Sequence, residues 1–517
     1  MLKRSAGVLI PLFSIRTADD RGCGEIPALS AMMDFALAMG HRAIQLLPIN
    51  ETAPSEASPY SALSLFAIDP VYIAAAALEG VDAAALDAAR GAARRGRVTR
   101  ARLHAAKLAL LDGAFRWFRS SASAEDRAAF ENFAERNRDW LHDYALFRAL
   151  KDRFDFASWE TWPEGLKRRD PAALDPARHE LSESIDKFCY FQFLADRQWS
   201  AIRREAAARG AMLGGDLSFS PAQDSADVWA HQELFILDRT VGTPPDAFAA
   251  EGQRWGLPMP NWERMRSEGH RWWRMRARHA AGLYDLFRVD HVVGLYRTFS
   301  FGPNRDEPGA YFPNDEGAQR WQGEEVLRAI KEEAGESAII AEDLGSIPPW
   351  VRESLAALGL PGYKVFRWEK ENWNTSEERF VPPSAYPELS VATTGTHDTD
   401  TLAAWWREAP EHERRQVCEA LKIAESNPGR RTLSAATLDA ILRAIYGAPS
   451  VLALVPVQDL FGWSTRINLP GTVGGRNWSY RLPFNLKPFG AGPAIQGRIE
   501  RLKAIAVSSG RFQGSAS

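Results

Sequence analysis

The chain has 517 residues, more than the roughly 100–200 of one ordinary domain, so it forms either several domains or one large barrel with insertions. Its 45% hydrophobic and 25% charged residues are close to globular averages and exclude a disordered or fibrous protein. The 63 Lys and Arg residues nearly balance the 66 Asp and Glu residues, which argues against a nucleic-acid-binding protein.

The three cysteines, Cys23, Cys189 and Cys418, are far apart and odd in number, so they predict neither a disulfide framework nor a zinc site. We therefore expect a protein of the reducing cytosol. The N-terminal apolar run from Gly7 to Phe13 is short and contains a proline, which favours a buried strand over a signal peptide. No stretch approaches the roughly 18 apolar residues of a spanning helix, so no membrane association is expected. A monomer is the predicted state.

Eight short apolar runs of strand character recur along the chain, mostly separated by helical patterns. The strands are predicted at Gly7–Phe13, Ala43–Ile49, Met212–Phe219, Leu286–Val293, Ala338–Leu344, Tyr363–Trp368, Val391–Thr396 and Leu452–Gln458, and helices at Ile26–Met39, Trp321–Ala334, Pro348–Leu358 and Gln416–Glu425. Mostly apolar runs suit a parallel sheet that is covered on both faces. Eight strands alternating with helices predict an α/β fold, the (β/α)8 TIM barrel. A doubly wound open sheet is the alternative, but no glycine-rich nucleotide-binding motif follows the first strand.

The spacing of the strands predicts two insertions. Residues 1–74 would form the first part of the catalytic barrel, and 75–205, which have helical periodicity, a helical insertion after the second strand. The rest of the barrel is predicted at 206–507, including an irregular, loop-rich insertion at 224–273 that is dense in Gly, Pro and Trp. A flexible tail is expected at 508–517.

Polar residues gather at the ends of the predicted strands, where TIM barrels carry their reactive groups. Asp290 lies in the C-terminal half of the fourth predicted strand and Glu342 in that of the fifth, and Asp398 follows the seventh. Any one such carboxylate is more often a structural partner of a cation or a backbone amide. Three of them at comparable positions, two beside a histidine, favour a catalytic centre instead.

The chemistry of glycosidic bond cleavage suits this set. It needs one carboxylate as nucleophile or base and one carboxylic acid to protonate the leaving oxygen. Arg288 lies two residues before Asp290 on the same strand face and favours its ionised form, which suits Asp290 to be the nucleophile. Glu342 is the predicted proton donor, its pKa raised by crowding and partial desolvation. Asp398 would stabilise the positive transition state.

Other polar and aromatic residues fit a sugar site. His291 and His397 offer N–H donors to sugar hydroxyls, although each alone is as readily a core residue. The 18 tryptophans are core mass or flat platforms for pyranose rings.

Short motifs distributed from about Gly7 to Arg481 resemble one family. They are Ser58-Pro59-Tyr60, Ser64-Leu65-Phe66-Ala67, Gly215-Asp216-Leu217, Asp224 through Trp229, Pro244-Pro245-Asp246 through Phe248, Gly252-Gln253-Arg254-Trp255-Gly256, Arg288-x-Asp290-His291, Ala341-Glu342-Asp343-Leu344-Gly345, Leu360-Pro361-Gly362, Gly395-Thr396-His397-Asp398, Gln458-Asp459, Asn468, Pro470-Gly471-Thr472 and Asn477-Trp478. In this order they resemble the 4-α-glucanotransferases of the amylomaltase, or disproportionating-enzyme, family (glycoside hydrolase family 77), related in fold to the α-amylases.

The resemblance implies Asp290 as nucleophile, Glu342 as acid/base and Asp398 as transition-state stabiliser. It also implies a set of residues around the sugars: Tyr60, stacking on the central ring; Asp216, Arg288, His291 and His397, binding that ring; Trp255, on the mobile loop of the acceptor side; and Asn468, near the donor end. Such enzymes move α-1,4-glucan segments from a donor to the 4-hydroxyl of another chain or of glucose, through a covalent glucosyl-enzyme. No metal or organic cofactor is implied.

The sequence departs from the family pattern near the acceptor side. Leu257 and Pro260 stand where Asn and an aromatic residue are usual, Thr399 replaces Asn, and the loop containing Val241-Gly242-Thr243 is shortened. A shorter lid admits water more easily, so we predict a larger share of hydrolysis than is usual in the family. An α-amylase-like hydrolase and a non-catalytic glucan-binding protein are the alternatives. The presence of Arg288 and all three carboxylates argues against the second.

Overall fold

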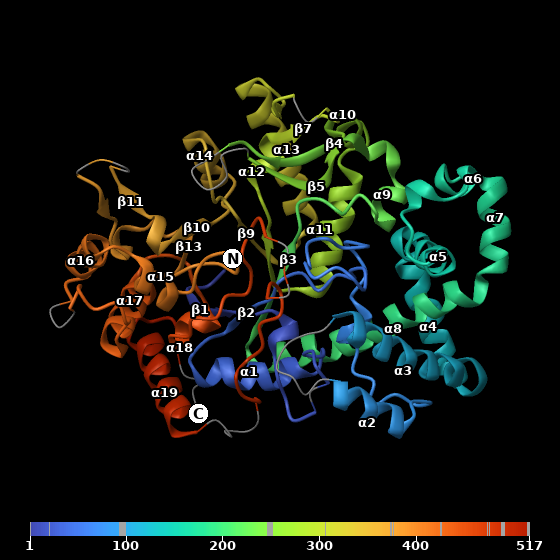
Figure 1. Ribbon diagram of the computed structural model, residues 1–517, viewed down its shortest axis with the longest axis horizontal. Helices are drawn as coiled ribbons and strands as arrows, with labels where there is room; N and C mark the ends of the chain where they lie inside the picture. The colour runs from blue at the N-terminus through green and yellow to red at the C-terminus, as the bar shows by residue number, and fades with distance from the viewer. Residues whose placement is uncertain are drawn as a thin grey trace.

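The computed structural model describes residues 2–19, 21–92, 100–245, 252–304, 307–372, 375, 377–423, 427–472, 474, 476–486 and 492–513. Eight parallel strands close into a barrel (Figure 1). Around the ring they follow the chain order: β1 (Ser5–Leu9), β2 (Ala43–Gln45), β3 (Met212–Leu217), β6 (Leu286–Val289), β9 (Ala338–Ala341), β10 (Gly362–Val365), β13 (Ser390–Thr393) and β14 (Leu452–Pro456), which pairs with β1. The predicted TIM barrel is confirmed, and each predicted strand overlaps one of these.

The strands end earlier than their apolar runs predict. The run Leu286–Val293 holds only the four residues of β6, because His291 takes a left-handed conformation (φ 44°) and the short helix α12 (Val293–Tyr296) follows. Val292 and Val293, the apolar residues of this run beyond the strand, are buried in the βα connection. Asp290 and Glu342 therefore come directly after β6 and β9 rather than within them.

Helices cover the outside of the barrel. They are α1 (Ala28–Ala38), α11 (Arg271–Leu283), α13 (Glu316–Glu333), α14 (Pro349–Ala357), α15 (Leu402–Glu408), α16 (Glu411–Ala420), α17 (Ala435–Gly447), α18 (Val457–Phe461) and α19 (Pro493–Ser508). Three predicted helices coincide with α1, α13 and α14 to within a few residues. The prediction at Gln416–Glu425 overlaps only the second half of α16, which starts after Pro410 and is followed by Lys422 at φ 54°.

A run of helices lies between β2 and β3, where the helical insertion is predicted, and projects to one side of the barrel (Figure 1). It comprises α2 (Ala83–Ala92), α3 (Arg100–Ser121), α4 (Ala124–Arg136), α5 (Arg138–Arg153), α6 (Glu164–Lys167), α7 (Pro171–Glu180) and α8 (Ser182–Arg209). The predicted boundary at 205 falls inside α8, which continues to Arg209 and stops at Gly210 (φ 66°), immediately before β3. A glycine tolerates this left-handed helix cap without steric cost.

One buried ion pair joins the insertion to the loop after β2. Arg148 of α5 donates from Nε to Glu51 Oε1 at 2.8 Å, and both side chains are fully buried. The Arg148 guanidinium lies between the rings of Phe156 and Phe188, 4.9 and 4.6 Å from their centroids. The same loop carries Tyr60, so the insertion supports a loop that reaches the barrel rim.

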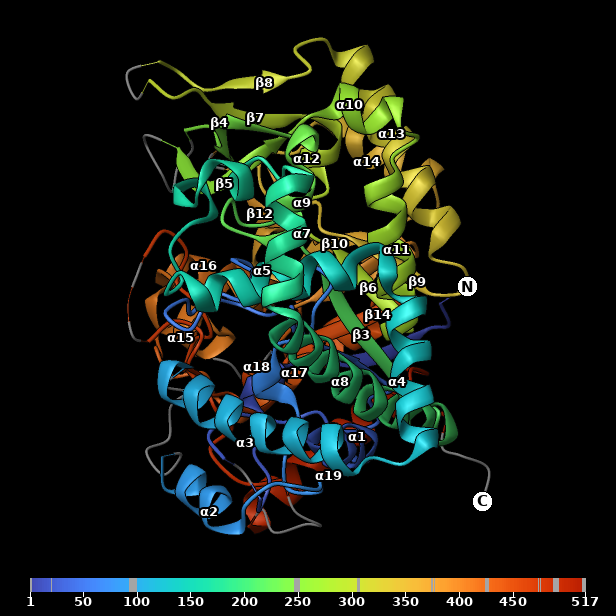
Figure 2. The ribbon, with the colours of Figure 1, turned by 90° about the vertical axis from the view of Figure 1, so that its right-hand side faces the viewer.

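The second insertion, predicted as loop-rich, is regular over most of its described part. Strands β4 (Phe235–Thr243) and β5 (Gln253–Pro260) form a hairpin that joins β7 (Thr298–Phe301) and β8 (Ala310–Phe312) in an antiparallel sheet of order β5-β4-β7-β8. This sheet lies at the top of the view in Figure 2. The expectation of irregular structure was wrong here, because two register shifts in the β4–β5 pairing remove a regular alternation of polar and apolar residues. Asp246 and Phe248 of the motif Pro244 through Phe248 lie outside the described residues.

The smaller elements connect this framework. They are the helices α9 (Ala226–Ala230) and α10 (Trp262–Ser267), the strands β11 (Lys370–Glu371) and β12 (Arg379–Phe380), and 3-10 turns at Leu12–Ser14, Pro70–Tyr72, Trp159–Thr161, Gln232–Leu234, Phe366–Trp368 and Pro383–Ala385. The three cysteines are buried, and none of them forms a disulfide with another described residue. Within the described ranges no helix has the length and apolar character that crossing a membrane requires.

The described part of the predicted tail packs onto the barrel. Ser508 is the last residue of α19, and the buried Arg511 beyond it donates to the backbone oxygens of Ser5, Tyr446, Ala448 and Ser450. These contacts correct the expectation of a flexible segment from 508 as far as Gln513. Residues 514–517 lie outside the described residues.

Candidate active site

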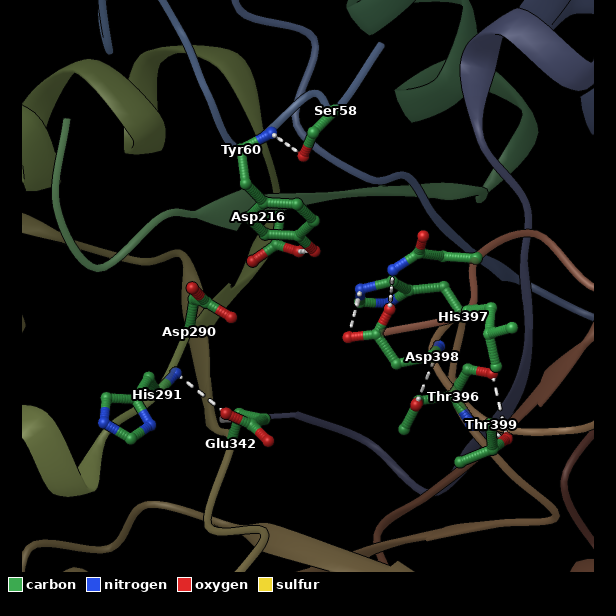
Figure 3. A network of polar contacts seen from close by, with 12 residues as sticks. Ser58, Tyr60, Asp216, Asp290, His291, Glu342, Thr396, His397, Asp398 and Thr399 are labelled. Atoms are coloured by element: carbon green, nitrogen blue, oxygen red, sulfur yellow. Dashed lines mark hydrogen bonds and ion pairs between the residues drawn. The ribbon is translucent and has the colours of Figure 1, made fainter. Parts of the chain in front are cut away.

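The predicted site residues meet at the carboxyl ends of the barrel strands (Figure 3). Asp290 and Glu342 lie near each other after β6 and β9. Asp398, in the turn after β13, faces them from the opposite side, with Tyr60 and Asp216 between the two groups (Figure 3). The structure thus brings together the three carboxylates that the sequence places on distant segments.

Strand register explains how Arg288 is held. Asp216 of β3 is the direct partner of Arg288 of β6 in the parallel pairing, so the two side chains point to the same face. Arg288 Nη1 donates to both carboxylate oxygens of Asp216, at 2.8 and 2.7 Å. The Tyr60 hydroxyl donates to Asp216 Oδ2 at 2.7 Å. Burial alone would lower the pKa of Arg288, but its acidic neighbours raise it above its usual value, so the group stays charged.

The other guanidinium nitrogen of Arg288 faces two of the acids. Nη2 lies 2.8 Å from Asp290 Oδ1 and 3.7 Å from Glu342 Oε2. Both oxygens lie beside the same nitrogen, so the distance between them cannot exceed the sum of these two distances. Arg288 therefore bridges the two acids and holds them close together.

Glu342 sits in a setting that keeps its proton. Its side chain is only 13% exposed, and burial together with the charge of Asp290 raises its pKa to about 8, against the opposing charge of Arg288. The backbone N–H of His291, turned by the left-handed conformation of that residue, donates to Glu342 Oε2 at 2.8 Å. The raised pKa predicted from the sequence is present, and desolvation is its largest cause.

Asp398 sits in the opposite kind of setting. Its side chain is 44% exposed, Asn468 Nδ2 donates to its Oδ1 at 2.7 Å, and His397 Nε2 lies 3.3 Å from its Oδ2. Although burial of the carboxyl group would raise its pKa, His397 and Asn468 lower it to about 2. Asp398 is therefore a fixed anion at neutral pH.

Aromatic and imidazole rings line the rim around the acids. The rings of Tyr60 and His397 stack with centroids 5.4 Å apart, and Trp478 packs against both, at 5.8 and 5.7 Å. On the other side Trp255, which was expected on a mobile loop, lies instead in strand β5, where pairing with β4 holds it, and meets His291 edge to face at 4.8 Å. Burial lowers the pKa of His291 to about 4, so its ring is neutral at pH 7.

Sequence reasoning missed the roles of three residues here. Trp478 stood in a quoted motif without a role, yet it closes the Tyr60–His397 stack. Arg466 donates to the backbone oxygen of Asp398 at 2.8 Å and pairs with Asp400 at 2.6 Å. The backbone N–H of Phe219 donates to Asp290 Oδ2 at 3.3 Å. Contacts across so many residues leave no periodic signal in one sequence.

Acidic, histidine and cysteine side chains are the residues that could bind a metal ion in this protein. In the part of the chain that the structure describes, no three or more of them are arranged to hold a metal ion. The polar groups at the rim instead form hydrogen bonds and ion pairs with one another.

A closed barrel with an arginine and three acids at its rim is the arrangement of an enzyme that acts on glycosidic bonds. A sequence model of the family described as 4-alpha-glucanotransferase matches residues 10–486. The 4-alpha-glucanotransferase of Thermus thermophilus is 36% identical over 473 residues, 88% of this chain and 90% of that protein. That of Chlamydia pneumoniae is 32% identical over 515 residues, 96% of this chain and 94% of that protein.

Among solved structures, the amylomaltase from Streptococcus agalactiae in complex with acarbose is similar over 99% of this chain and 100% of its own, with a TM-score of 0.85 and 26% identity. The chain belongs to the 4-alpha-glucanotransferase family. It is an enzyme of that class, as the resemblance of its motifs predicts.

Proposed function

We propose that the protein transfers α-1,4-glucan segments between maltooligosaccharides, or from a maltooligosaccharide to glucose, with retention of anomeric configuration. Asp290 is the nucleophile, Glu342 the acid/base and Asp398 the transition-state stabiliser. The observation that carries this assignment is the contrast between a Glu342 carboxyl with a pKa of about 8 and an Asp398 carboxylate with a pKa of about 2 at one rim. A bond cleavage that needs one acid and one fixed anion finds both there.

In the first step Asp290 Oδ attacks the anomeric carbon of the donor. The glycosidic C–O bond breaks, and the leaving 4-oxygen takes the proton of Glu342, so the reducing-end fragment departs with a free hydroxyl. Positive charge develops on the sugar ring in the transition state, and the negative charge of Asp398 stabilises it. Arg288 and the Phe219 N–H orient Asp290 for the attack.

In the second step the 4-hydroxyl of an acceptor sugar enters. Glu342, now ionised, removes the proton of that hydroxyl while the acceptor oxygen attacks the anomeric carbon, and the Asp290–carbon ester bond breaks. Asp290 leaves as a carboxylate and Glu342 regains its proton, so the enzyme returns to its starting state. Water in place of the acceptor would give hydrolysis.

The substrate class follows from the site and is supported by a relative. The partly exposed Tyr60 and Trp255 lie beside His397 and His291 at two sides of the acids, and aromatic rings of this kind can pack on the sugar units of an α-glucan chain. The Streptococcus agalactiae amylomaltase is described in complex with acarbose, and we propose that this chain binds acarbose in the same rim. His291, His397, Asp216 and Asn468 complete the proposed sugar contacts.

We further propose that the helical part, 75–205 extended to Arg209, supports the Tyr60 loop through the Glu51–Arg148 pair in a monomeric enzyme. Replacing Arg148 by Met leaves the buried Glu51 with the Tyr144 hydroxyl as a donor but without its cation, which costs about 3–5 kcal/mol of stability. A fall in Tm accompanied by weaker acarbose binding would support the proposal. A fall in Tm with unchanged binding would contradict it.

Product analysis with maltotriose tests the reaction. Transfer yields glucose and longer oligomers while the number of reducing ends stays constant. A rise in reducing ends measures hydrolysis. The expected short loop at Val241–Thr243 is instead the end of strand β4, so the larger share of hydrolysis predicted from it stays a prediction for this assay. If reducing ends alone accumulate and no oligomer longer than maltotriose forms, the α-amylase-like alternative replaces transfer. Unchanged maltotriose with tight acarbose binding would favour the glucan-binding protein.

A further inference from the structure

Arg276 is a buried cation that contacts no anionic side chain in the described part of the chain. It lies on α11, outside the barrel, and its guanidinium carbon is 4.6 Å from the ring centroids of both Trp272 and Trp273. Its Nε and Nη1 atoms find no hydrogen-bond acceptor within the described residues. Burial lowers its pKa to about 9, against the effects of Asp227 and Asp290, so it still carries charge at pH 7. A buried charge without a nearby opposite charge lowers the stability of the fold, so we expect Arg276 to serve a function at this position.

The contact that Arg276 does make leads to Asp290. Its Nη2 donates to the backbone oxygen of Ser218, directly after β3. The same peptide unit, Ser218–Phe219, presents its N–H to Asp290 Oδ2 at 3.3 Å. One peptide group thus has a cation at its carbonyl end and the proposed nucleophile at its amide end. Charges at both ends of a peptide dipole strengthen each other's hydrogen bonds.

The surroundings hold this peptide in one orientation. The Phe219 ring packs edge to face on His291 at 5.5 Å and lies 6.5 Å from the ring of Trp273. Trp273 is one of the two rings that enclose Arg276. Arg276, the Ser218–Phe219 peptide and His291 therefore form one packed unit, so a shift of Arg276 would also change the position of the Asp290 carboxylate.

We infer that Arg276 is a positioning residue for the proposed nucleophile, acting on Asp290 through the Ser218–Phe219 peptide. This rests on the proposed role of Asp290. By fixing the peptide, Arg276 selects the carboxylate rotamer that faces the sugar and adds positive potential behind it. It touches neither substrate nor the reacting atoms.

Other charged groups also act on Asp290, and Arg276 must be separated from them. They are Arg288 on its own strand, Asp216 on β3, Glu342 after β9, Tyr60 on the loop after β2, and the neighbouring His291 ring. Asp227, after β3, is the further acid whose charge acts on Arg276. Substitution at Arg276 alters none of these side chains directly.

The test compares Arg276→Met with Arg511→Met in the full-length enzyme. Arg511 is likewise buried, with its pKa lowered to about 9, and donates only to backbone oxygens, but it packs beside Ser5 at the opposite, amino-terminal end of the barrel. Both variants should lose Tm. Only Arg276→Met should lower kcat for maltotriose, by about 10- to 100-fold at little changed KM, as expected for a misplaced reacting group.

The pH profile gives a readout that stability alone would not move. Losing the cation removes positive potential behind the nucleophile, so the acid limb of kcat/KM should move to higher pH, by less than the loss of an adjacent cation would give. Arg276→Lys keeps the charge and should leave that limb in place. If Arg276→Met does not fold, Arg276→Gln, which keeps a donor without the charge, should show the same shift.

Three outcomes decide the inference. A lower kcat and a shifted acid limb in Arg276→Met but not in Arg511→Met would support it. Equal behaviour of the two variants, a loss of Tm alone, would overturn it while leaving the proposed function intact. Full activity of Asp290→Ala would instead overturn the proposed function itself.

Discussion

The two sides of the barrel rim shift the pKa values of their acids in opposite directions. On the β6–β9 side the side chains of Asp290 and Glu342 are 20% and 13% exposed and share the buried Arg288. Across from them, after β13, the Asp398 side chain is 44% exposed and is held by His397 and Asn468. The first setting raises the pKa of Glu342 to about 8, and the second lowers that of Asp398 to about 2.

This difference shows that position at a strand end does not set the role of an acid. Glu342 accepts one hydrogen bond from a backbone N–H and lies beside another carboxylate. Desolvation therefore has the largest effect on its pKa, which it raises. Asp398 accepts from an amide and lies beside an imidazole, so hydrogen bonding to its ionised form dominates. One rim can thus hold a proton donor and a permanent anion at the same pH.

The largest effect is expected from removing the reacting groups on the β6–β9 side. Asp290→Ala or Glu342→Gln should lower kcat for maltotriose by about 10³-fold or more, because the nucleophile or the proton donor is lost. Asp343→Asn is the matched control, since Asp343 is adjacent to Glu342 but binds Arg352 and the Tyr363 N–H. A similar loss in Asp343→Asn would show that the assay reports folding rather than chemistry.

Asp398→Asn should give the next largest effect. Replacing the anion by a neutral isostere removes stabilisation of the positive transition state, which we expect to cost about 10²- to 10³-fold in kcat. The KM for maltotriose should change little. A change confined to KM would place Asp398 in ground-state binding and contradict its proposed role.

The pH dependence of activity should report Glu342. The first step needs its protonated form, so kcat/KM should fall as the pH rises through about 8. An α-maltosyl donor with a good leaving group, such as fluoride, needs no protonation and should lose this basic limb in the bond-breaking step. Persistence of the limb with that donor would assign it to another group.

The same raised pKa makes a smaller prediction for stability. Between the ordinary value of 4.5 and about 8, the folded protein holds a proton at Glu342 that the unfolded chain releases. Stability therefore falls as the pH rises through this window. Glu342→Gln removes that dependence, so its gain in Tm over the parent should be larger at pH 8 than at pH 5. An equal difference at both values would mean that Glu342 is not held protonated.

The smallest effect on kcat is expected from removing the hydrogen bond that Asn468 donates to Asp398. Asn468→Ala removes one hydrogen bond to its carboxylate, while the neighbouring His397 remains. Because a pKa of about 2 lies far below neutrality, Asp398 stays ionised without Asn468, and kcat should fall by only about tenfold. A loss as large as that of Asp398→Asn would contradict a role that runs only through this hydrogen bond, and would make the proposed sugar contact of Asn468 its main contribution.

Much of this frame could be predicted from the sequence. Apolar runs located all eight barrel strands, and carboxylates at their ends located the acids, because parallel strands bring their carboxyl ends to one rim. The β4–β5 hairpin was missed because its register shifts break the alternation of side chains. Arg466, Trp478 and Arg276 act on the site through contacts between distant segments, and such contacts leave no mark on local periodicity.

The central claim, a covalent glucosyl-enzyme on Asp290, is tested most directly by trapping that intermediate. In Glu342→Gln an α-maltosyl fluoride can still glycosylate the enzyme, because fluoride leaves without an acid, but no base remains to activate the acceptor. Intact mass spectrometry should show the protein heavier by one maltosyl unit, and peptide mapping should place the adduct on Asp290. Turnover without any adduct, or an adduct on another residue, would contradict the account.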